Sequence, residues 1–318
     1  MNINRMVGGK AKRQRLSNRY NANRAANLHM TGTMIITGSD AGYFEYAREL
    51  ILSLDRQATR DASLGFLDLG LAEEQRQWLR ERGATVVRPQ SRLDFRGREW
   101  PVGMFGYLAR PYMRENFPGF DTYVWLDADA WLQDSHTIAE LVAAATDTGA
   151  AFVRQREPSY RYTWWLRGWF VKHYVLGYGV VRGLLLASMP AINNGVFAIR
   201  AGAPHWDAWH RHYQAAYDRT QLPGPHDQFS LNAAVLVERL PASYLPATYN
   251  WICDLARPVW DAETGTFRVP RGPHELIRVM HLAGPAKKLD YDLEVLGGGS
   301  RRGSLRFGRM ADAPSGQV

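Results

Sequence analysis

Two carboxylates follow an apolar segment in the middle of the chain. Residues 123–129 read Tyr-Val-Trp-Leu-Asp-Ala-Asp, so Asp127 and Asp129 stand two positions apart after a run typical of a buried strand. In open α/β sheets, ligands bind outside the carboxyl ends of the strands. Two hard oxygen ligands at such a place suit Mg²⁺ or Mn²⁺, which in turn binds a diphosphate. The alternative is that both acids are ordinary polar residues after a strand.

A histidine and a lysine pair occur together far downstream. Residues 281–288 read His-Leu-Ala-Gly-Pro-Ala-Lys-Lys, at the end of the last segment that resembles a strand. Imidazole is an acceptable third ligand for Mn²⁺, and lysines after a Gly-Pro turn suit phosphate oxygens. His281 taken alone also fits a buried or exposed histidine, and Lys287 with Lys288 also fits a solvated pair. Their position at a strand end, like that of the Asp pair, favours a shared site.

Two further polar segments stand where core residues would be expected. Asn193-Asn194-Gly195 precedes the apolar run Val-Phe-Ala-Ile, and its glycine permits close approach of a ligand to the backbone. His226-Asp227-Gln228 opens a segment with helical spacing. The first segment is then either a turn or a sugar contact. Asp227 is either a helix N-cap or a residue that contacts a sugar.

The elements that must position these residues alternate along the chain. Short apolar runs typical of strands are separated by segments with helical spacing, which indicates βαβ units and a mainly parallel sheet. We expect strands over 34–38, 64–69, 85–87, 122–126, 150–153, 195–199 and 277–282, and helices over 43–54, 72–82, 105–116, 138–146, 204–218 and 228–237. The predicted fold is a single α/β domain, Rossmann-like, with helices on both sides of the sheet.

The chain has 318 residues and a net charge of +8, which is unevenly distributed. Residues 1–33 hold seven basic residues and no acid, and residues 299–318 have a net charge of +3, so the body of the chain is close to neutral. We therefore predict a basic disordered leader over 1–33, one domain over 34–298 and a flexible basic tail over 299–318. A near-neutral body offers no basic face for nucleic acid. Cys253 is the only cysteine, which excludes an internal disulfide framework and fits a reducing, cytoplasmic compartment.

The segments from residue 34 to residue 288 resemble, in their order, the GT-A glycosyltransferases similar to family 8, which includes the glycogenins and bacterial lipopolysaccharide hexosyltransferases. The first strand with its following loop, residues 34–43, resembles the nucleotide-contacting segment of that family. The other positions that match are Arg110, Asp127, Asp129, Asn193, Gly195, Asp227, Gln228, Leu231, Asn232, His281, Gly284 and Lys287. The chain departs from the family pattern at Phe229, where a second acid is usual, and at Lys288-Leu289, where Pro-Trp is usual.

The resemblance implies a GT-A domain and a metal-dependent hexosyltransferase that uses a UDP-sugar. It implies Mn²⁺ (or Mg²⁺) held by Asp127, Asp129 and His281, and catalytic roles for Gln228 and Asp227 with retention of anomeric configuration. The donor-binding residues that it implies are Ser39, Tyr43, Arg110, Asp127, Asn193, Gly195, Gly284 and Lys287. The acceptor is left open between a glycan, a lipid-linked sugar and a protein. The alternatives are an inverting transferase, a sugar-nucleotide nucleotidyltransferase and an inactive scaffold of the same fold.

An aromatic and basic insert lies between the fifth and sixth predicted strands, over residues 158–192. Leu166, Phe170, Tyr174 and Tyr178 are four apart and share one helix face, with Trp165 beside it. Such a density of Trp, Tyr and Arg suits a membrane interface or a lipid-linked acceptor, and the alternative is ordinary core. We therefore expect either a peripheral contact with the inner face of a membrane or a packed helix.

Overall fold

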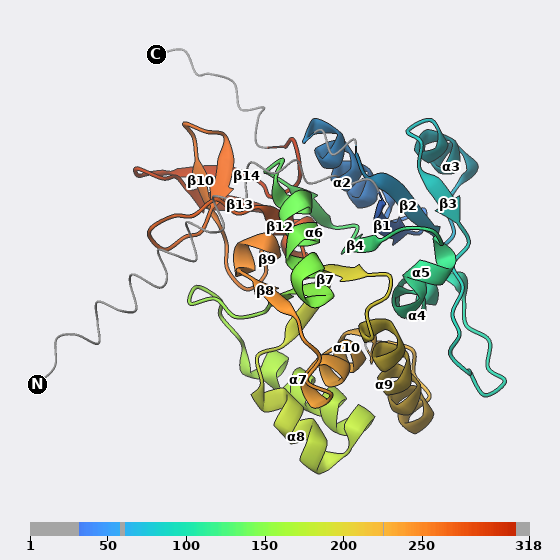
Figure 1. Ribbon diagram of the computed structural model, residues 1–318. Coiled ribbons are helices and arrows are strands. Elements are labelled where there is room, and N and C mark those ends of the chain that lie inside the picture. Colours follow the sequence, from blue (N-terminus) through green and yellow to red (C-terminus); the bar gives the residue numbers. More distant parts are fainter. Residues whose placement is uncertain (1–31, 58–60, 225, 310–318) are drawn as a thin grey trace, which may run out of the picture.

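A seven-stranded sheet with the order β3-β2-β1-β4-β7-β6-β8 forms the centre of the molecule (Figure 1). The computed structural model describes residues 32–57, 61–224 and 226–309. The strands are β1 (Thr33–Ser39), β2 (Ser63–Asp68), β3 (Thr85–Val87), β4 (Thr122–Leu126), β6 (Ala150–Arg154), β7 (Ile192–Arg200) and β8 (Ser243–Leu245). Neighbours are parallel except that β7 is antiparallel to both β4 and β6. The predicted α/β fold with a mainly parallel sheet is confirmed.

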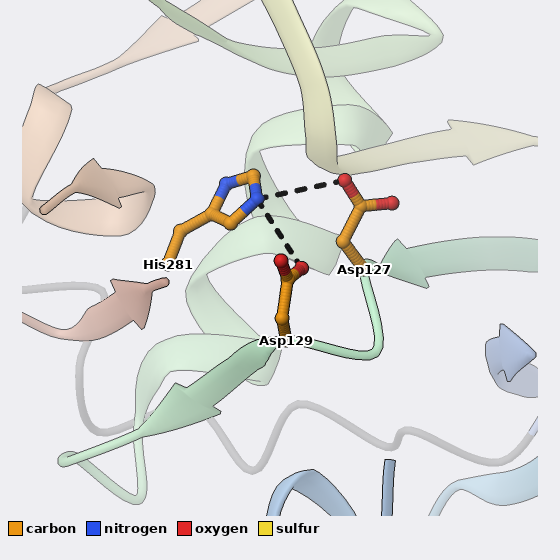
Figure 2. Close-up of side chains that lie close together, drawn as sticks. All are labelled: Asp127, Asp129 and His281. Atoms are coloured by element: carbon orange, nitrogen blue, oxygen red, sulfur yellow. Dashed lines mark ion pairs between the residues drawn. The ribbon is translucent and has the colours of Figure 1, made fainter. Parts of the chain in front are cut away.

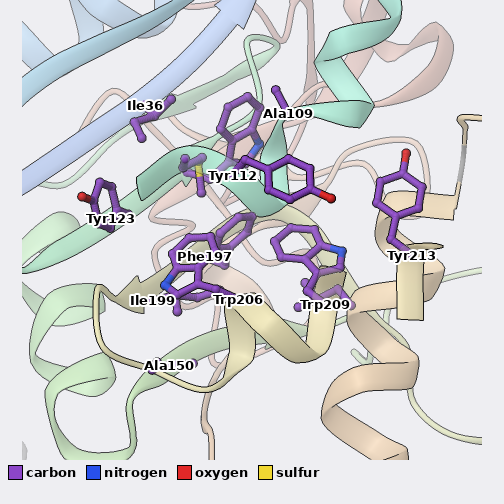
Figure 3. Packing of buried hydrophobic residues seen from close by; sticks show 14 of the residues in the cluster. Ile36, Ala109, Tyr112, Tyr123, Ala150, Phe197, Ile199, Trp206, Trp209 and Tyr213 are labelled. Carbon is purple, nitrogen blue, oxygen red and sulfur yellow. The ribbon is translucent and has the colours of Figure 1, made fainter. Parts of the chain in front are cut away.

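Strand β4 shows how the sequence places two cores, one on each side of the sheet. All five of its residues are buried, and successive side chains point to opposite faces. Tyr123 and Trp125 belong to one apolar cluster, whereas Val124 and Leu126 belong to the other. Figure 3 shows the first cluster, in which Tyr123 packs edge-on against Trp206, with 5.9 Å between ring centroids. The sheet is therefore held from both sides, and the turn after β4 starts from a rigid strand.

Helices cover both of these clusters. On one side lie α2 (Phe44–Arg56) and α6 (Thr137–Thr148), and on the other lies α9 (His205–Thr220), while α3 (Glu73–Arg80) packs near β3. The predicted helix over residues 105–116 is instead broken into α4 (Phe105–Leu108), a 3₁₀ turn over Arg110–Tyr112 and α5 (Met113–Asn116). Pro111, in the middle of that turn, explains the break because it lacks an amide hydrogen.

A second, three-stranded sheet was not expected from the sequence. It has the order β5-β12-β9 and consists of β5 (Ala130–Leu132), β12 (Val279–His281) and β9 (Trp251–Ile252). Strand β12 pairs antiparallel with β5 and parallel with β9. A separate hairpin of β10 (Val259–Asp261) and β11 (Thr266–Arg268) lies beyond it. This small sheet brings the C-terminal part of the chain against the end of β4.

The prediction of a flexible tail from residue 299 onward is wrong for residues 299–309. Strand β14 (Ser300–Ser304) pairs with β13 (Asp290–Glu294), and three glycines at 297–299 with positive φ close the turn between them. Leu305 is fully buried, and its carbonyl accepts a hydrogen bond from Trp131 Nε1 at 2.9 Å. The Gly, Ser and Arg composition therefore reflects a tight hairpin. Residues 310–318 and residues 1–31 of the predicted leader lie outside the described residues, and Thr33 already belongs to β1.

The aromatic insert forms a helical hairpin of α7 (Trp164–Tyr178) and α8 (Val180–Ser188). It packs against α9 and α10 (His226–Val237), and α8 lies at the lower edge of the molecule in Figure 1. Tyr174 is buried against Phe229 and Ala233, so one face of the insert is ordinary core, as one of the two predictions proposed. Among the described residues, no helix has the length and apolarity that crossing a bilayer requires.

Candidate active site

Asp127 and Asp129 lie in the turn that connects β4 to β5, at the carboxyl edge of the central sheet. The turn is held by its backbone: the amide of Ala130 donates to Asp127 O at 2.9 Å, and the amide of Asp127 donates to Gly195 O at 2.8 Å. The second bond attaches the turn to the neighbouring strand β7. Asp129 is buried and Asp127 is partly exposed. The two carboxylates are thus fixed where strand ends meet, as the sequence predicts.

The register of the small sheet brings His281 to these acids. His281 stands opposite Ala130 in the β5–β12 ladder, and the amide of Leu282 donates to Asp129 O at 2.8 Å. As Figure 2 shows, the imidazole points between the two carboxylates. Its Nε2 lies 3.6 Å from Asp127 Oδ2 and 3.5 Å from Asp129 Oδ1. One ligand atom from each of the three side chains lies within 4.8 Å of the others.

A chain of hydrogen bonds fixes which nitrogen of His281 faces the acids. The amide of Gly195 donates to Asn193 Oδ1 at 2.9 Å, so this atom is an acceptor. Asn250 Nδ2 donates to the same oxygen at 2.9 Å, which turns Asn250 Oδ1 toward His281 Nδ1 at 2.8 Å. Nδ1 must then be the donor, and Nε2 of the neutral ring keeps its lone pair toward Asp127 and Asp129.

The three side chains fit a divalent cation. Two carboxylates and one imidazole form a donor set that suits Mn²⁺ and accommodates Mg²⁺. In the neutral ring, the lone pair of His281 Nε2 points into the space between Asp127 and Asp129, as a metal ligand requires, and Nδ1 has the hydrogen-bond partner that ligating histidines have. Burial lowers the pKa of His281, but hydrogen bonding to Asp129 and the charges of both acids outweigh it, so its pKa is raised overall. In the protonated ring Nε2 carries a proton toward the acids, and a cation that binds there would have to displace it.

Lys287 and Tyr43 contact the same acid from another direction. Lys287 Nζ lies 2.6 Å from Asp129 Oδ2 and also contacts the Tyr43 hydroxyl, which donates to that oxygen at 2.9 Å. Lys287 ends a 3₁₀ turn that begins at Gly284, whose φ of +67° favours glycine. Burial would raise the pKa of Asp129, but hydrogen bonds and charges from His281 and Lys287 hold it below the ordinary value. Asp129 is therefore ionised and has a fixed orientation.

Arg110 joins the Asp pair to the start of α10. It is buried, and its guanidinium binds Asp227 Oδ2 at 2.8 Å through Nη1 and Asp127 Oδ1 at 2.6 Å through Nη2. Asn194 Nδ2 also donates to Asp227 Oδ2, at 2.7 Å. Burial raises the pKa of Asp227, although Arg110 opposes that shift. Trp125 Nε1 donates to Asp127 Oδ1 at 2.8 Å and completes the support of this carboxylate.

Most of the site residues predicted from the sequence meet in this one network. Direct contacts connect Tyr43, Arg110, Asp127, Asp129, Asn193, Gly195, Asp227, His281 and Lys287, with Asn194 and Asn250 as bridging residues. Ser39 is buried at the carboxyl end of β1, and within the described part of the chain its hydroxyl has no hydrogen-bond partner. Gln228 follows Asp227 in the first turn of α10 and is partly exposed. Gly284 begins the turn that carries Lys287.

Two supporting residues were missed from the sequence. Asn250 orients His281, yet it stands between Tyr249 and Trp251 with nothing in its spacing to mark it. In the sequence, Trp125 is typical of a core residue in the strand before the acids. Only the structure shows that its indole nitrogen also donates a hydrogen bond to Asp127. The one sequence signal for Asn250 is a lone amide among apolar residues, and this signal does not reveal its partner.

Phe229, the departure from the family pattern, faces the insert. Its ring is fully buried and lies 4.5 Å from the Tyr174 ring and 5.4 Å from the Trp169 ring, centroid to centroid. It also stacks on His173 at 5.6 Å with an interplanar angle of 6°. The helical hairpin covers this position, so the Phe229 ring packs against other aromatic rings in a buried site, where burying a carboxylate would be costly.

Comparison with known proteins gives matches to solved structures. No protein-family model and no curated protein matches the chain. It is similar to the galactosyltransferase LgtC in complex with donor and acceptor sugar analogs, at 15% identity and a TM-score of 0.48 over 80% of this chain and 88% of that one. It is also similar to mouse xyloside xylosyltransferase 1, at 14% identity and a TM-score of 0.45 over 78% and 96%. Core-mannan synthase A from Aspergillus fumigatus, in its Mn/GDP form, matches at 10% identity and a TM-score of 0.43 over 69% and 73%. These proteins are glycosyltransferases, the class that the sequence resembles.

Proposed function

We propose that this protein is a metal-dependent glycosyltransferase that moves a hexose from a UDP-sugar to a glycan, a lipid-linked sugar or a protein. The observation that carries the proposal is the convergence of Asp127, Asp129 and His281 at the end of β4, with ligand atoms within 4.8 Å of one another. Residues so far apart in the sequence meet there only because the β5–β12 ladder is in this register. The residue types are those that hold a cation against a diphosphate.

In this proposal, different groups of residues bind the metal, the diphosphate and the nucleotide. Asp127, Asp129 and His281 would hold Mn²⁺ (or Mg²⁺), which when bound supplies positive charge to the diphosphate leaving group. Lys287 places a second positive charge beside Asp129, and it would share the negative charge of the departing nucleotide. Ser39 and Tyr43, at and after the end of β1, would contact the nucleotide. Asn193 and Gly195 line the β7 side, with Gly284 shaping the turn that carries Lys287.

The proposed outcome is retention of anomeric configuration. Gln228, in the first turn of α10, would lie near the reacting face of the sugar. An amide is a poor nucleophile, which favours attack by the acceptor on the face that the leaving group vacates over a covalent glycosyl-enzyme. Asp227 is paired with Arg110 and Asn194, and it would hold sugar hydroxyls in place. Among the described residues, we identify no equally supported candidate for the base that an inverting reaction requires.

The test is UDP release from a panel of UDP-sugars, with Mn²⁺ and then with EDTA. We expect hydrolysis of one donor that requires Mn²⁺ and stops with EDTA. Asp129→Ala should abolish it while the circular dichroism spectrum stays that of the wild type. Asp147→Ala, an exposed acid on α6, is the matched control and should keep full activity. Near-normal turnover in Asp129→Ala would contradict the metal assignment.

Donor binding is a second readout that does not depend on turnover. UDP with Mn²⁺ should raise the melting temperature of the wild type, and UDP with EDTA should leave it unchanged. If neither UDP-sugar hydrolysis nor a thermal shift occurs, the metal site is wrong and an inactive scaffold of this fold becomes the better description.

A further inference from the structure

Exposed apolar side chains gather on the α7–α8 hairpin. Of the fourteen large apolar side chains that are exposed among the described residues, nine lie between residues 164 and 189. The most exposed are Trp164 at 89%, Val181 at 85% and Trp165 at 75%. The others are Val171, Leu176, Val180, Leu184, Leu185 and Met189. A soluble monomer rarely leaves so many in one place, so this surface is suited to a partner.

The hairpin behind this surface is a packed structure. Tyr174 and Leu186 are buried with Phe229 of α10, so the opposite faces of both helices are already covered. A Cβ added at Gly183 would lie 2.6 Å from the backbone of Val175, which shows how closely the two helices approach. The exposed residues are therefore held by a rigid support. They are the outer face of a folded element.

The charge of this segment restricts what covers it. Residues 158–192 contain Arg161, Arg167, Lys172 and Arg182 and no Asp or Glu. None of the four forms an ion pair with a carboxylate of the described residues. A second copy of the chain would bring four more positive charges to the same face, so the two copies would repel each other there. The leader over 1–33, with seven basic residues and no acid, would be repelled for the same reason. A partner with complementary charge must therefore present an anionic surface.

A hollow opens beside the hairpin on the same side. It has a volume of about 500 Å³ and lies between α7, the end of α8 and the segment after β6. Phe170, Tyr174 and Met189 line its apolar part, and Arg156 and Arg167 line its polar part. Tyr174 is 1% exposed, and its hydroxyl has no hydrogen-bond partner among the described residues. Within the described part of the chain, neither arginine pairs with a carboxylate, and together with the unpartnered hydroxyl of Tyr174 they suit a phosphate group.

We propose that the α7–α8 hairpin docks the protein on an anionic lipid bilayer, with a lipid phosphate in the hollow at Arg156 and Arg167. Tryptophan and aliphatic side chains would enter the interface between headgroups and acyl chains, and the basic side chains would remain at the headgroups. Both the apolar and the charged features of the hairpin are used in this arrangement. The proposal does not depend on the proposed catalytic activity.

The first test is co-sedimentation of the full chain with vesicles of phosphatidylglycerol and phosphatidylcholine, compared with phosphatidylcholine alone. The wild type should bind the anionic vesicles. Trp164→Ser/Trp165→Ser should weaken partitioning on the order of tenfold or more, because two large side chains no longer enter the interface. Leu222→Ser/Leu296→Ser, which removes exposed apolar groups outside the hairpin, should bind like the wild type. Since the basic ends of the chain are unchanged in all variants, equal binding by the Trp variant would overturn the proposal.

The second test concerns the hollow. Arg156→Gln/Arg167→Gln should remove most of the preference for anionic over neutral vesicles, whereas Arg239→Gln/Arg271→Gln, at exposed positions outside the hairpin, should keep it. Unchanged preference in the first pair would remove the phosphate site from the proposal. Analytical ultracentrifugation without vesicles completes the set. A dimer that the Trp variant abolishes would show that a second copy covers the hairpin and would overturn the lipid assignment.

Discussion

Replacing Gly195 by alanine tests whether the packing behind His281 sets the geometry of the site. A Cβ at this position would lie 2.4 Å from His281 Cε1, 2.8 Å from His281 Nδ1 and 2.9 Å from Asn193 Oδ1. An ordinary contact begins at about 3.4 Å, so the ring or strand β7 must retreat by about 1 Å. The ring has little freedom to do so, because it is 4% exposed and Nδ1 is bonded to Asn250.

Two effects of this displacement have predictable sizes. Forcing an extra carbon into a packed site costs about 1–3 kcal/mol in the free energy of unfolding. Metal ligands must hold their distances within about 0.2 Å, so a shift of about 1 Å in His281 Nε2 takes it out of range. Loss of one ligand's orientation weakens metal binding about 10- to 100-fold. Gly195→Ala should therefore lower both stability and affinity for Mn²⁺.

The assay combines urea unfolding with calorimetric titration of Mn²⁺. The matched control is Gly202→Ala, in the turn after β7, where an added Cβ would meet nothing within 4 Å and φ is not positive. This control should keep the affinity of the wild type and nearly its stability. The comparison separates the effect of the His281 contact from that of any glycine replacement next to this strand.

Each result has a definite meaning. A Gly195→Ala variant that binds Mn²⁺ within twofold of the wild type and unfolds at the same urea concentration would refute the packing argument altogether. A variant that loses stability but keeps its Mn²⁺ affinity would show that the contact is real and that His281 is no ligand. Loss of both, with the control unchanged, is the expected result.

Three further outcomes follow from the described contacts. Arg110→Met should lower the free energy of unfolding by about 3–5 kcal/mol in urea titrations, because it leaves the buried Asp227 and the partly exposed Asp127 without their cation. A loss below about 1 kcal/mol would contradict this pairing. Gly183→Ala should lower the melting temperature by separating α7 from α8, whereas Gly168→Ala, with open space around it, should leave it equal or higher. Burial lowers the pKa of His205 from 6.5 to about 4. As the pH falls, His205 is therefore protonated in the unfolded chain before it is protonated in the folded one. The free energy of unfolding should decline between about pH 6.5 and pH 4. His205→Gln should reduce that decline by up to about 3 kcal/mol, measured by urea unfolding at several pH values, and an unchanged slope would show that His205 is not the source.

The central fold could be predicted because its signals are local. Strand β4 was predicted with the bounds that it has, since five consecutive apolar or β-branched residues are bounded by polar ones. Strand β5 was missed because three residues after a turn carry no periodic signal. The tail was mispredicted for the same reason, because a composition rich in Gly, Ser and Arg indicates a flexible segment. The hairpin of β13 and β14 instead depends on three glycines and on the contact of Leu305 with Trp131, which the composition does not reveal.

The residues of the candidate site likewise fall into those that local sequence signals indicate and those that depend on the tertiary structure. The meeting of Asp127, Asp129 and His281 could be predicted because carboxylates and a histidine at strand ends are visible in a sequence. Asn250 was missed because its role depends on the register of β9 beside β12, which no local pattern encodes. Arg110 was placed near the donor through a resemblance only. Its actual position between two acids depends on the break in the helix at Pro111.

The charges of the network support the proposal that a cation and a diphosphate bind together at this place. Among the described residues, the ion-pair partners of Asp127, Asp129 and Asp227 are Arg110, Lys287 and His281, so with a neutral His281 the cluster has a formal charge of −1. A dianionic or more highly charged diphosphate would be repelled by that cluster. A divalent cation held by Asp127, Asp129 and His281 would change the charge of the cluster to +1, and the site would then attract the diphosphate. The two positive charges of Lys287 and Arg110 do not by themselves outweigh the three carboxylates. Their ion pairs with these acids hold both side chains in position for the diphosphate.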